Sequence, residues 1–84
     1  MYIDRYDKNG TQIQLDDYLL RADGGIYKVI FNLTLLSIGI VDADETFFFM
    51  DNWIKEEWEV KTYDELFNSN DSIENYIEVL GEAV

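Results

Sequence analysis

The sequence predicts a small, mainly β domain over residues 1–84, built as a small barrel or a highly twisted antiparallel sheet of five to six strands. One or two short helical segments are expected near the C-terminus. Two observations support this fold class. Apolar and polar residues alternate strictly over residues 11–15, which is the period of a half-buried strand. Turn signals recur every few residues, and Asp23-Gly24-Gly25 is the strongest, because glycine reverses a chain at little steric cost.

Hairpins are expected to organise the first half of the chain. Residues 2–6 form a short extended segment that ends in a tight turn over residues 7–10, where Asn-Gly supplies the positive φ that such turns need. The stretch 11–31 reads as two strands folded back on each other at the glycine pair. Asp16 and Asp17 interrupt its first arm with a bend or bulge. Its second arm is rich in β-branched and aromatic residues, which is typical of a strand.

The apolar run over residues 33–41 is long enough for a buried helix, but we predict a strand. Four of its nine residues are β-branched, and its glycine would weaken a helix by about 1 kcal/mol. A polar turn over residues 42–45 and a short strand over residues 46–50 follow. Alternation then favours a last barrel-type strand near residues 57–62.

The C-terminal part of the chain has helical signals. Residues 63–67 read as a short helical turn, in which Thr62 is the N-cap and Glu65 completes a capping box. Residues 71–81 carry apolar side chains at i, i+3, i+4 and i+7, with a capping residue before them and a glycine after them, which favours a short helix. Residues 76–80 fit a closing strand equally well, and both interpretations stay open.

The composition excludes most of the side chains that enzymes use for catalysis. The chain has no cysteine and no histidine, so thiolate metal sites, disulfides and the commonest general base are missing. Carboxylates are the remaining candidates, but neighbouring strand residues point to opposite faces rather than into one pocket. The turn over residues 42–45 fails the EF-hand pattern, although a loose surface calcium site there stays open. We therefore expect a protein that is not an enzyme, with no cofactor and no resident metal.

Acidic residues are concentrated in the second half of the chain. The net charge is -12: residues 1–41 hold five acids and four bases, whereas residues 42–84 hold thirteen acids and two bases. This charge repels phosphate backbones and anionic lipid, so we expect no direct binding to nucleic acid and none to a membrane. There is no apolar leader and no run of about 20 apolar residues, and a cytoplasmic location is expected.

Two segments carry a resemblance to known proteins. Residues 7–20, DKNGTQIQLDDYLL, are similar to a pattern of Asp, any residue, Asn-Gly, two residues, Ile, two residues, then Gly-Asp and a hydrophobic strand. Residues 77–82, IEVLGE, are similar to a Glu-Val-Ile-Gly-Asn ending. This pattern resembles small phage and prophage proteins with SH3-like barrels, including the YopX-like family. Asp16 stands where that family has glycine, and Glu82 where it has asparagine. The resemblance implies an SH3-like barrel of phage or mobile-element origin and a strand in the tail. It supplies no catalytic residues.

Aromatic residues are interleaved with the acids of the second half. The three consecutive phenylalanines at 47–49 must send side chains to both faces of a strand, so either the sheet is covered on both sides or an aromatic is exposed. Exposed aromatics ringed by carboxylates suit a basic, partly apolar protein surface. The candidate partner-binding residues are Asp42, Asp44, Glu45, Asp51, Trp53, Glu56, Glu57, Glu59, Asp64 and Glu65.

These features favour a small acidic interaction protein that binds a basic surface of a partner protein. One form of this hypothesis is an inhibitor that imitates nucleic acid, which predicts carboxylates clustered on one face. The alternative is a structural or oligomerising accessory barrel, including a homodimer, which predicts scattered carboxylates and a symmetric apolar contact. A hydrolase with two carboxylates would need both acids in one pocket. A plainer interpretation is that the aromatics form the core and the acids keep the domain soluble.

Overall fold

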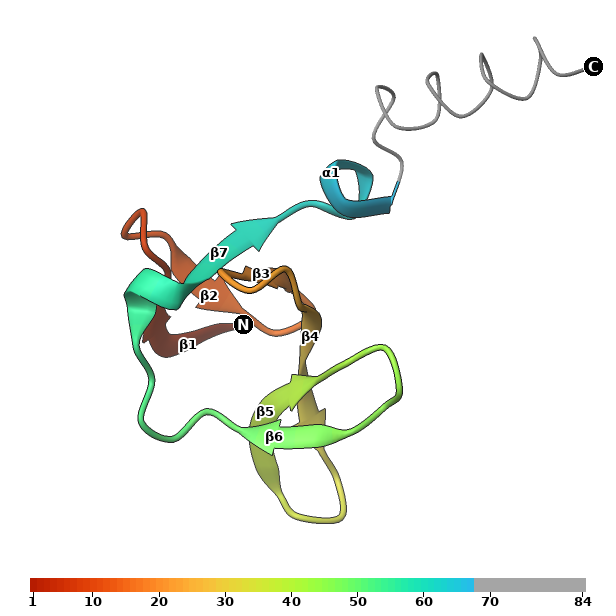
Figure 1. The fold of residues 1–84 in the computed structure, drawn as a ribbon. Helices are drawn as coiled ribbons and strands as arrows, with labels where there is room; N and C mark the ends of the chain where they lie inside the picture. The colour runs from red at the N-terminus through yellow and green to blue at the C-terminus, as the bar shows by residue number, and fades with distance from the viewer. Residues whose placement is uncertain (68–84) are drawn as a thin grey trace, which may run out of the picture.

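The computed structural model describes residues 1–67, which form seven short strands, a 3₁₀ turn and a short helix (Figure 1). The strands are β1 (Tyr2–Tyr6), β2 (Gln12–Gln14), β3 (Tyr18–Arg21), β4 (Ile26–Asn32), β5 (Ser37–Val41), β6 (Phe47–Phe49) and β7 (Trp58–Lys61). The 3₁₀ turn η1 (Lys55–Glu57) precedes β7, and the helix α1 (Tyr63–Phe67) follows it. The mainly β prediction is confirmed, with more strands than the five to six expected. The two interpretations of residues 71–81 lie outside the described residues.

The strands form two antiparallel sheets. β3, β4, β5 and β6 make a meander, and β7 returns along the free edge of β3, which gives the order β6-β5-β4-β3-β7. β1 and β2 pair in a separate two-stranded sheet. Among the described residues no ladder joins β6 to β7, so these two strands remain the edges of a sheet that does not close into a barrel.

The register places the buried apolar residues of the five-stranded sheet on one face. Leu19 of β3 pairs with Tyr27 of β4, and Val29 of β4 pairs with Ile40 of β5, and paired residues of antiparallel strands point the same way. The β1–β2 hairpin covers this face. The buried core comprises Ile3, Ile13, Leu19, Val29, Ile40, Met50 and Trp58. Trp58 is the only aromatic among these, so the interpretation of the aromatics as the core is wrong for most of those that the structure describes.

The stretch 11–31 contains three strands rather than two. The turn at the glycine pair is present between β3 and β4, and the predicted interruption at Asp16 is also present, where φ is 72°. Because the chain bends there, β2 pairs with β1, whereas β3 pairs with β4 and β7. A left-handed backbone is the conformation that glycine adopts most easily, so Asp16 holds a backbone conformation that is uncommon for a residue with a side chain.

The predicted strand over residues 33–41 is too long. Only Ser37–Val41 is a strand, and residues 33–36 form the turn between β4 and β5. The Asn32 carboxamide oxygen accepts a hydrogen bond from the Leu35 backbone N–H at 2.9 Å, and Leu36 has a φ of 51°. Side-chain capping by asparagine and one left-handed residue therefore decide this turn, against the apolar character of its sequence.

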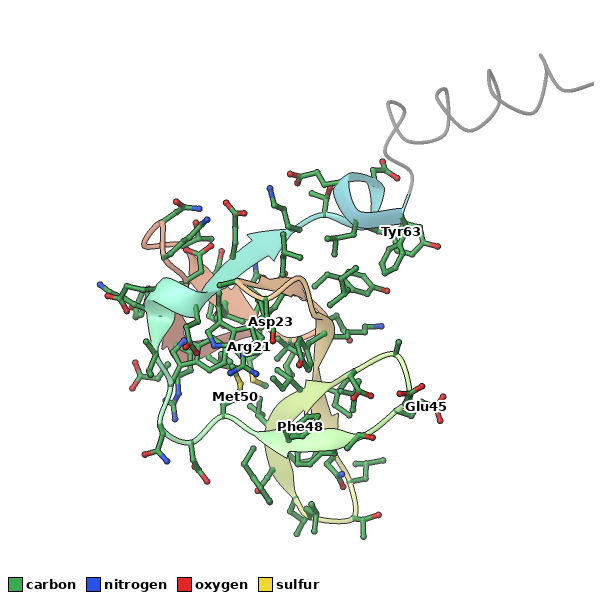
Figure 2. All side chains as sticks on the ribbon, viewed as in Figure 1. Arg21, Asp23, Glu45, Phe48, Met50 and Tyr63 are labelled. Carbon is green, nitrogen blue, oxygen red and sulfur yellow. The ribbon has the colours of Figure 1, made fainter. Side chains whose placement is uncertain are left out.

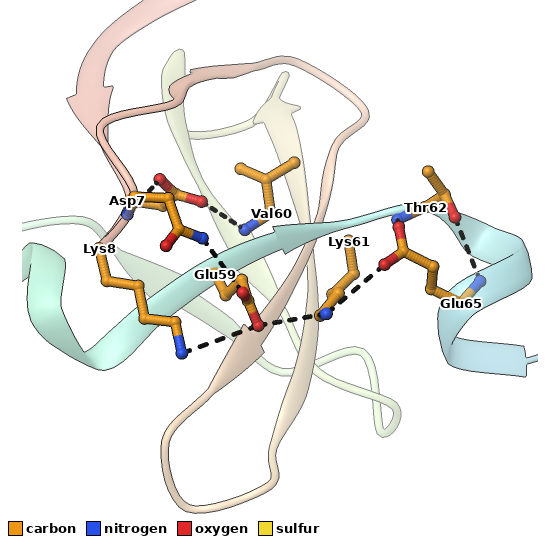
Figure 3. Close-up of polar contacts among 8 residues, drawn as sticks. Asp7, Lys8, Glu59, Val60, Lys61, Thr62 and Glu65 are labelled. Atoms are coloured by element: carbon orange, nitrogen blue, oxygen red, sulfur yellow. Dashed lines mark hydrogen bonds and ion pairs between the residues drawn. The ribbon is translucent and has the colours of Figure 1, made fainter.

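A buried carboxylate connects the first hairpin to the last strand. Asp7 is only 1% exposed. Its Oδ1 accepts hydrogen bonds from the backbone N–H groups of Asn9 at 2.9 Å and Thr11 at 2.8 Å, which closes the predicted turn. Its Oδ2 accepts a hydrogen bond from the Val60 N–H of β7 at 2.9 Å (Figure 3). The same carboxylate thus shapes the β1–β2 turn and holds it against the edge of the five-stranded sheet.

Candidate protein-binding site

A cleft of about 250 Å³ opens between β6, the loop that follows it, and β7. We call it the aromatic cleft. In Figure 2, Arg21 and Phe48 lie in the middle of the domain, whereas Glu45 lies at its periphery. The cleft is lined by Arg21, Tyr27, Ile40, Phe48, Phe49, Asp51, Asn52, Trp53, Glu57 and Trp58. It therefore combines aromatic walls with one cation and two carboxylates.

The strand register explains why these rings meet. Arg21 pairs with Trp58 across β3 and β7, and Phe48 pairs with Ile40 across β5 and β6, so their side chains share the face on which Tyr27 lies. The Tyr27 ring contacts both edges of the sheet: its centroid is 6.2 Å from that of Phe48 and 5.2 Å from that of Trp58, both in edge-to-face geometry. Sheet curvature brings β6 and β7 together around Tyr27, although no hydrogen bonds join these two strands.

Trp53 fixes the loop between β6 and η1. Its ring stacks on Trp58 with centroids 4.6 Å apart and an interplanar angle of 13°. Its indole N–H donates a hydrogen bond to the Tyr6 carbonyl oxygen at 2.8 Å. Because stacking and a hydrogen bond to β1 both hold this side chain, the wall that it forms is part of the folded chain itself.

Arg21 is the cation of the cleft. Its guanidinium lies 5.3 Å from the centroid of the Trp58 ring and 3.6 Å from a Glu57 carboxylate oxygen. The pKa of Arg21 is raised, first because the guanidinium donates a hydrogen bond to the Tyr27 side chain and then because Asp23 and Glu57 are close. Arg21 therefore stays charged and occupies one face of Trp58 with a cation–π contact.

Three of the ten predicted partner-binding residues line this cleft, namely Asp51, Trp53 and Glu57. The others lie on the β5–β6 turn, on η1, on β7 and on α1. Figure 1 shows the β5–β6 turn, η1 and α1 on three different sides of the domain. The structure thus separates the predicted acids into groups instead of joining them in one patch.

Asp42 stabilises the β5–β6 turn that contains it. Its Oδ1 accepts hydrogen bonds from the N–H groups of Asp44 at 2.9 Å and Thr46 at 3.0 Å, and Glu45 has a φ of 64°. The loop over residues 7–11 has the same design. It begins with an Asp, its fourth residue is the left-handed Gly10 with a φ of 77°, and its fifth residue is a Thr. The shared pattern Asp-x-x-x-Thr shows that Asp42 shapes a hairpin loop.

Glu59 and Glu65 belong to a chain of ion pairs around Lys61 (Figure 3). Lys61 Nζ lies 3.3 Å from Glu59 Oε1 and 3.5 Å from Glu65 Oε2, and Lys8 Nζ lies 3.8 Å from the same Glu59 oxygen. The pKa of Glu59 is lowered, mainly by a hydrogen bond from the Asn9 side chain and then by Lys61. Glu59 in turn raises the pKa of Lys61. These acids are therefore partly neutralised by bases of the same chain.

The capping box predicted at α1 is confirmed. Glu65 Oε1 accepts a hydrogen bond from the Thr62 N–H at 3.0 Å, and Thr62 Oγ1 accepts one from the Glu65 N–H at 3.1 Å. The backbone and side chain of Thr62 lower the pKa of Glu65, and Lys61 adds to this effect. The Glu65 carboxylate is thus engaged in capping the helix.

Several cleft residues were missed among the predicted site residues. Arg21 and Tyr27 come from the nearly neutral half of the chain, where charge gives no signal, and Trp58 belongs to the interleaved aromatics but was not among the ten candidate residues. The expectation that an aromatic of residues 47–49 is exposed is confirmed, because Phe48 and Phe49 are both exposed. Correct strand pairing is the signal that joins these residues, and sequence alternation alone does not provide it.

Among residues 1–67, no group of three or more acidic side chains is placed to hold a metal ion. Within the same part of the chain, neither η1 nor α1 has the length and hydrophobicity that crossing a membrane requires. No protein-family model matches the chain, and no curated protein or solved structure matches it.

Proposed function

We propose that this chain is a small acidic, non-enzymatic interaction protein that binds a basic surface of a partner protein through the aromatic cleft. The observation that carries the proposal is the meeting of Tyr27, Phe48, Trp53 and Trp58 beside two carboxylates. Aromatic side chains held in a pocket are the usual anchors of protein interfaces, and charges around them set orientation and association rate.

The arrangement fits the long cationic side chains of a basic surface. Lysine and arginine pack their aliphatic stems on apolar rings and place their charged ends beside carboxylates, and a cation over an aromatic ring gains about 0.5–2 kcal/mol depending on desolvation. Arg21 already covers one face of Trp58, so the exposed ring of Phe48 and the Asp51 carboxylate are the positions open to a partner. The net charge of -12 would attract such a partner over a distance of several ångströms.

Imitation of nucleic acid has less support than binding through the cleft. A phosphate mimic needs free carboxylates in a regular array, whereas Glu57, Glu59 and Glu65 are paired with cations of this chain. We also propose the SH3-like barrel as the finer description of the fold and phage or mobile-element origin as its source. The β3–β6 meander, the 3₁₀ turn and the return of β7 beside β3 support that fold.

Affinity capture with matched variants tests the proposal. The immobilised wild-type protein is incubated with bacterial lysate at about 0.05 M and about 0.5 M salt, which changes the Debye length roughly threefold. The variant Phe48→Ser alters the cleft, and Phe67→Ser is its control, because both phenylalanines are 44% exposed and Phe67 lies on α1. Asp51→Asn and Glu45→Gln form a second pair that removes one carboxylate from the cleft or from the β5–β6 turn.

The proposal predicts a basic partner that is retained at low salt and lost at high salt. Phe48→Ser and Asp51→Asn should lose it, and the two control variants should keep it. Trp53 and Trp58 are the only tryptophans of the chain, and both line the cleft, so titration with the purified partner should shift the intrinsic fluorescence. Equal capture by all four variants, or an unchanged tryptophan spectrum on binding, would exclude the cleft as the binding site.

A further inference from the structure

The turn between β4 and β5 carries exposed apolar side chains at its end. Leu33 is 79% exposed and Leu36 is 73% exposed, and Phe31 and Leu35 beside them are also exposed. We call these four residues the hairpin tip. Figure 1 shows this turn projecting from the domain on the side away from α1. Four side chains of this size expose on the order of 400 Å², which is within the range of the largest apolar patches on soluble monomers.

The hairpin tip belongs to the only long segment of the chain without acids. Residues 24–41 contain no Asp or Glu and one Lys, although the whole chain of 84 residues has 18 acids. The carboxylates described above lie in the turns and loops that join β1 to β2, β2 to β3, β3 to β4 and β5 to β6, in the loop after β6, and on η1, β7 and α1. None lies on the β4–β5 hairpin. The hairpin is therefore an acid-free and mostly apolar projection from a strongly acidic domain.

The backbone of the tip holds a leucine in an unfavourable state. Leu36 has a φ of 51°, a conformation that glycine and asparagine adopt readily and a leucine side chain does not. The hydrogen bond from the Leu35 N–H to the Asn32 side chain fixes the turn in this shape. Leu36 is thus both strained and exposed, and neither property stabilises the isolated domain. Residues that break local rules in this way are expected at functional surfaces.

We propose that the hairpin tip is a self-association surface, at which two copies of this chain meet around a two-fold axis. In an isologous contact, Phe31, Leu33, Leu35 and Leu36 of one copy pack against the same residues of the other. Two tips together would bury on the order of 800 Å², which corresponds to a weak, reversible dimer. The contact does not involve the aromatic cleft, so it stands independently of the proposed function.

Charge favours a second copy as the occupant. Two chains of net charge -12 repel each other, and this repulsion is smallest when the acid-free hairpins face each other and the acidic elements point away. The tip has no ring of lysine or arginine, which a segment that binds anionic lipid would need. Salt screens the repulsion and leaves the apolar contact intact, so the dimer should strengthen as salt rises. Binding of a basic partner has the opposite salt dependence.

Sedimentation equilibrium of the full chain tests the contact. The protein is measured from about 5 µM to about 1 mM, a range that covers the dissociation constants of weak dimers, at about 0.05 M and about 0.5 M NaCl. The test variants are Leu36→Gly, which suits the positive φ and removes an exposed side chain, and the double variant Leu33→Ser/Leu36→Gly. The control is Ile54→Ser, because Ile54 is 54% exposed and lies in the loop before η1.

The proposal predicts a monomer–dimer equilibrium that tightens at high salt. Leu36→Gly should weaken it about tenfold, the double variant should weaken it further, and Ile54→Ser should leave it unchanged. The single variant decides the question if the double variant unfolds. A wild-type chain that stays monomeric at the highest concentration and salt would overturn the proposal. Equal weakening by Ile54→Ser would also overturn it, as would a monomer whose tip instead binds phosphatidylcholine vesicles.

Discussion

Replacing Asp7 with asparagine should strongly destabilise the domain, whereas the same change at Asp42 should not. Both carboxylates accept two backbone hydrogen bonds within loops of the same design. Asp7 also accepts a third from Val60 and is 1% exposed, whereas Asp42 is half-buried and, among the described residues, its carboxylate accepts hydrogen bonds only from its own turn. Asp42→Asn is therefore a control in which the turn chemistry is the same.

The expected magnitude follows from the number of acceptor atoms. An asparagine amide has one acceptor oxygen, so it can keep the two loop bonds at residue 7 only by directing its NH₂ group at the Val60 N–H. This loses a charge-assisted hydrogen bond and leaves a buried donor unpaired, which costs about 2–4 kcal/mol. At Asp42 the amide oxygen keeps both bonds, and the cost should stay below about 0.5 kcal/mol. Asp7→Asn should then lower the melting temperature by about 10–20 °C.

Urea unfolding followed by tryptophan fluorescence measures this difference directly. Both tryptophans pack in the folded domain, so their emission reports global unfolding, and an unchanged m-value would show that the unfolded states are comparable. If the free energies of unfolding of Asp7→Asn and Asp42→Asn lie within about 0.5 kcal/mol of each other, the hydrogen bond from Val60 adds no stability beyond that of the loop bonds. The bridging role assigned to Asp7 would then be wrong.

Three further predictions concern the turns, the sheet and pH. Gly39→Ala should destabilise the domain by about 2 kcal/mol or more in the same urea assay, because the alanine Cβ would overlap the Phe47 ring and lie 2.5 Å from the Phe48 carbonyl oxygen. If the urea midpoint of this variant equals that of wild type, β5 and β6 can move apart without loss of stability, and the prediction is wrong. Glu45→Gly should stabilise the domain by about 0.5 kcal/mol, because glycine relieves the left-handed strain at a φ of 64°. Glu45→Gln is the control for the lost charge. If Glu45→Gly is no more stable than Glu45→Gln, the strain argument is wrong. The folded-state pKa of Glu59 is below the ordinary glutamate value of 4.5, so the contribution of Glu59 to stability is present above that pH and is lost as the pH falls through the folded-state pKa. Thermal unfolding should therefore show wild type losing more stability than Glu59→Gln on acidification below about pH 4.5, and parallel pH profiles would contradict this.

Turn chemistry made much of the fold predictable from sequence. The turns over residues 7–10 and 42–45, the reversal at Asp23-Gly24-Gly25 and the capping box at Thr62 depend on side chains within a few residues of the backbone they bind. Such interactions are visible in a short window of sequence. The turn after Asn32 was predicted less well, because its apolar residues are typical of a strand.

The aromatic cleft and the bridge from Asp7 were not predictable in the same way. The contact between Tyr27 and Phe48, and the hydrogen bond from Val60 to Asp7, join segments that are distant in the chain. Periodicity shows that a residue faces the core, but it does not show which strand lies beside it. Charge density directed attention to the acidic half, and the cleft also needs Arg21 from the other half.

The position of β7 has a consequence for the order in which the chain can fold. β7 pairs with β3, which is made about 40 residues earlier in the chain, and its Val60 also meets the Asp7 carboxylate 53 residues away. Contacts of such long sequence separation form slowly, because the ends of a long loop must first be brought together. During synthesis the hairpins before residue 57 can form locally, but neither the core around Trp58 nor the site around it is complete until β7 emerges. A nascent chain that stops short of β7 should therefore expose Ile13, Leu19 and Val29 and depend on chaperones.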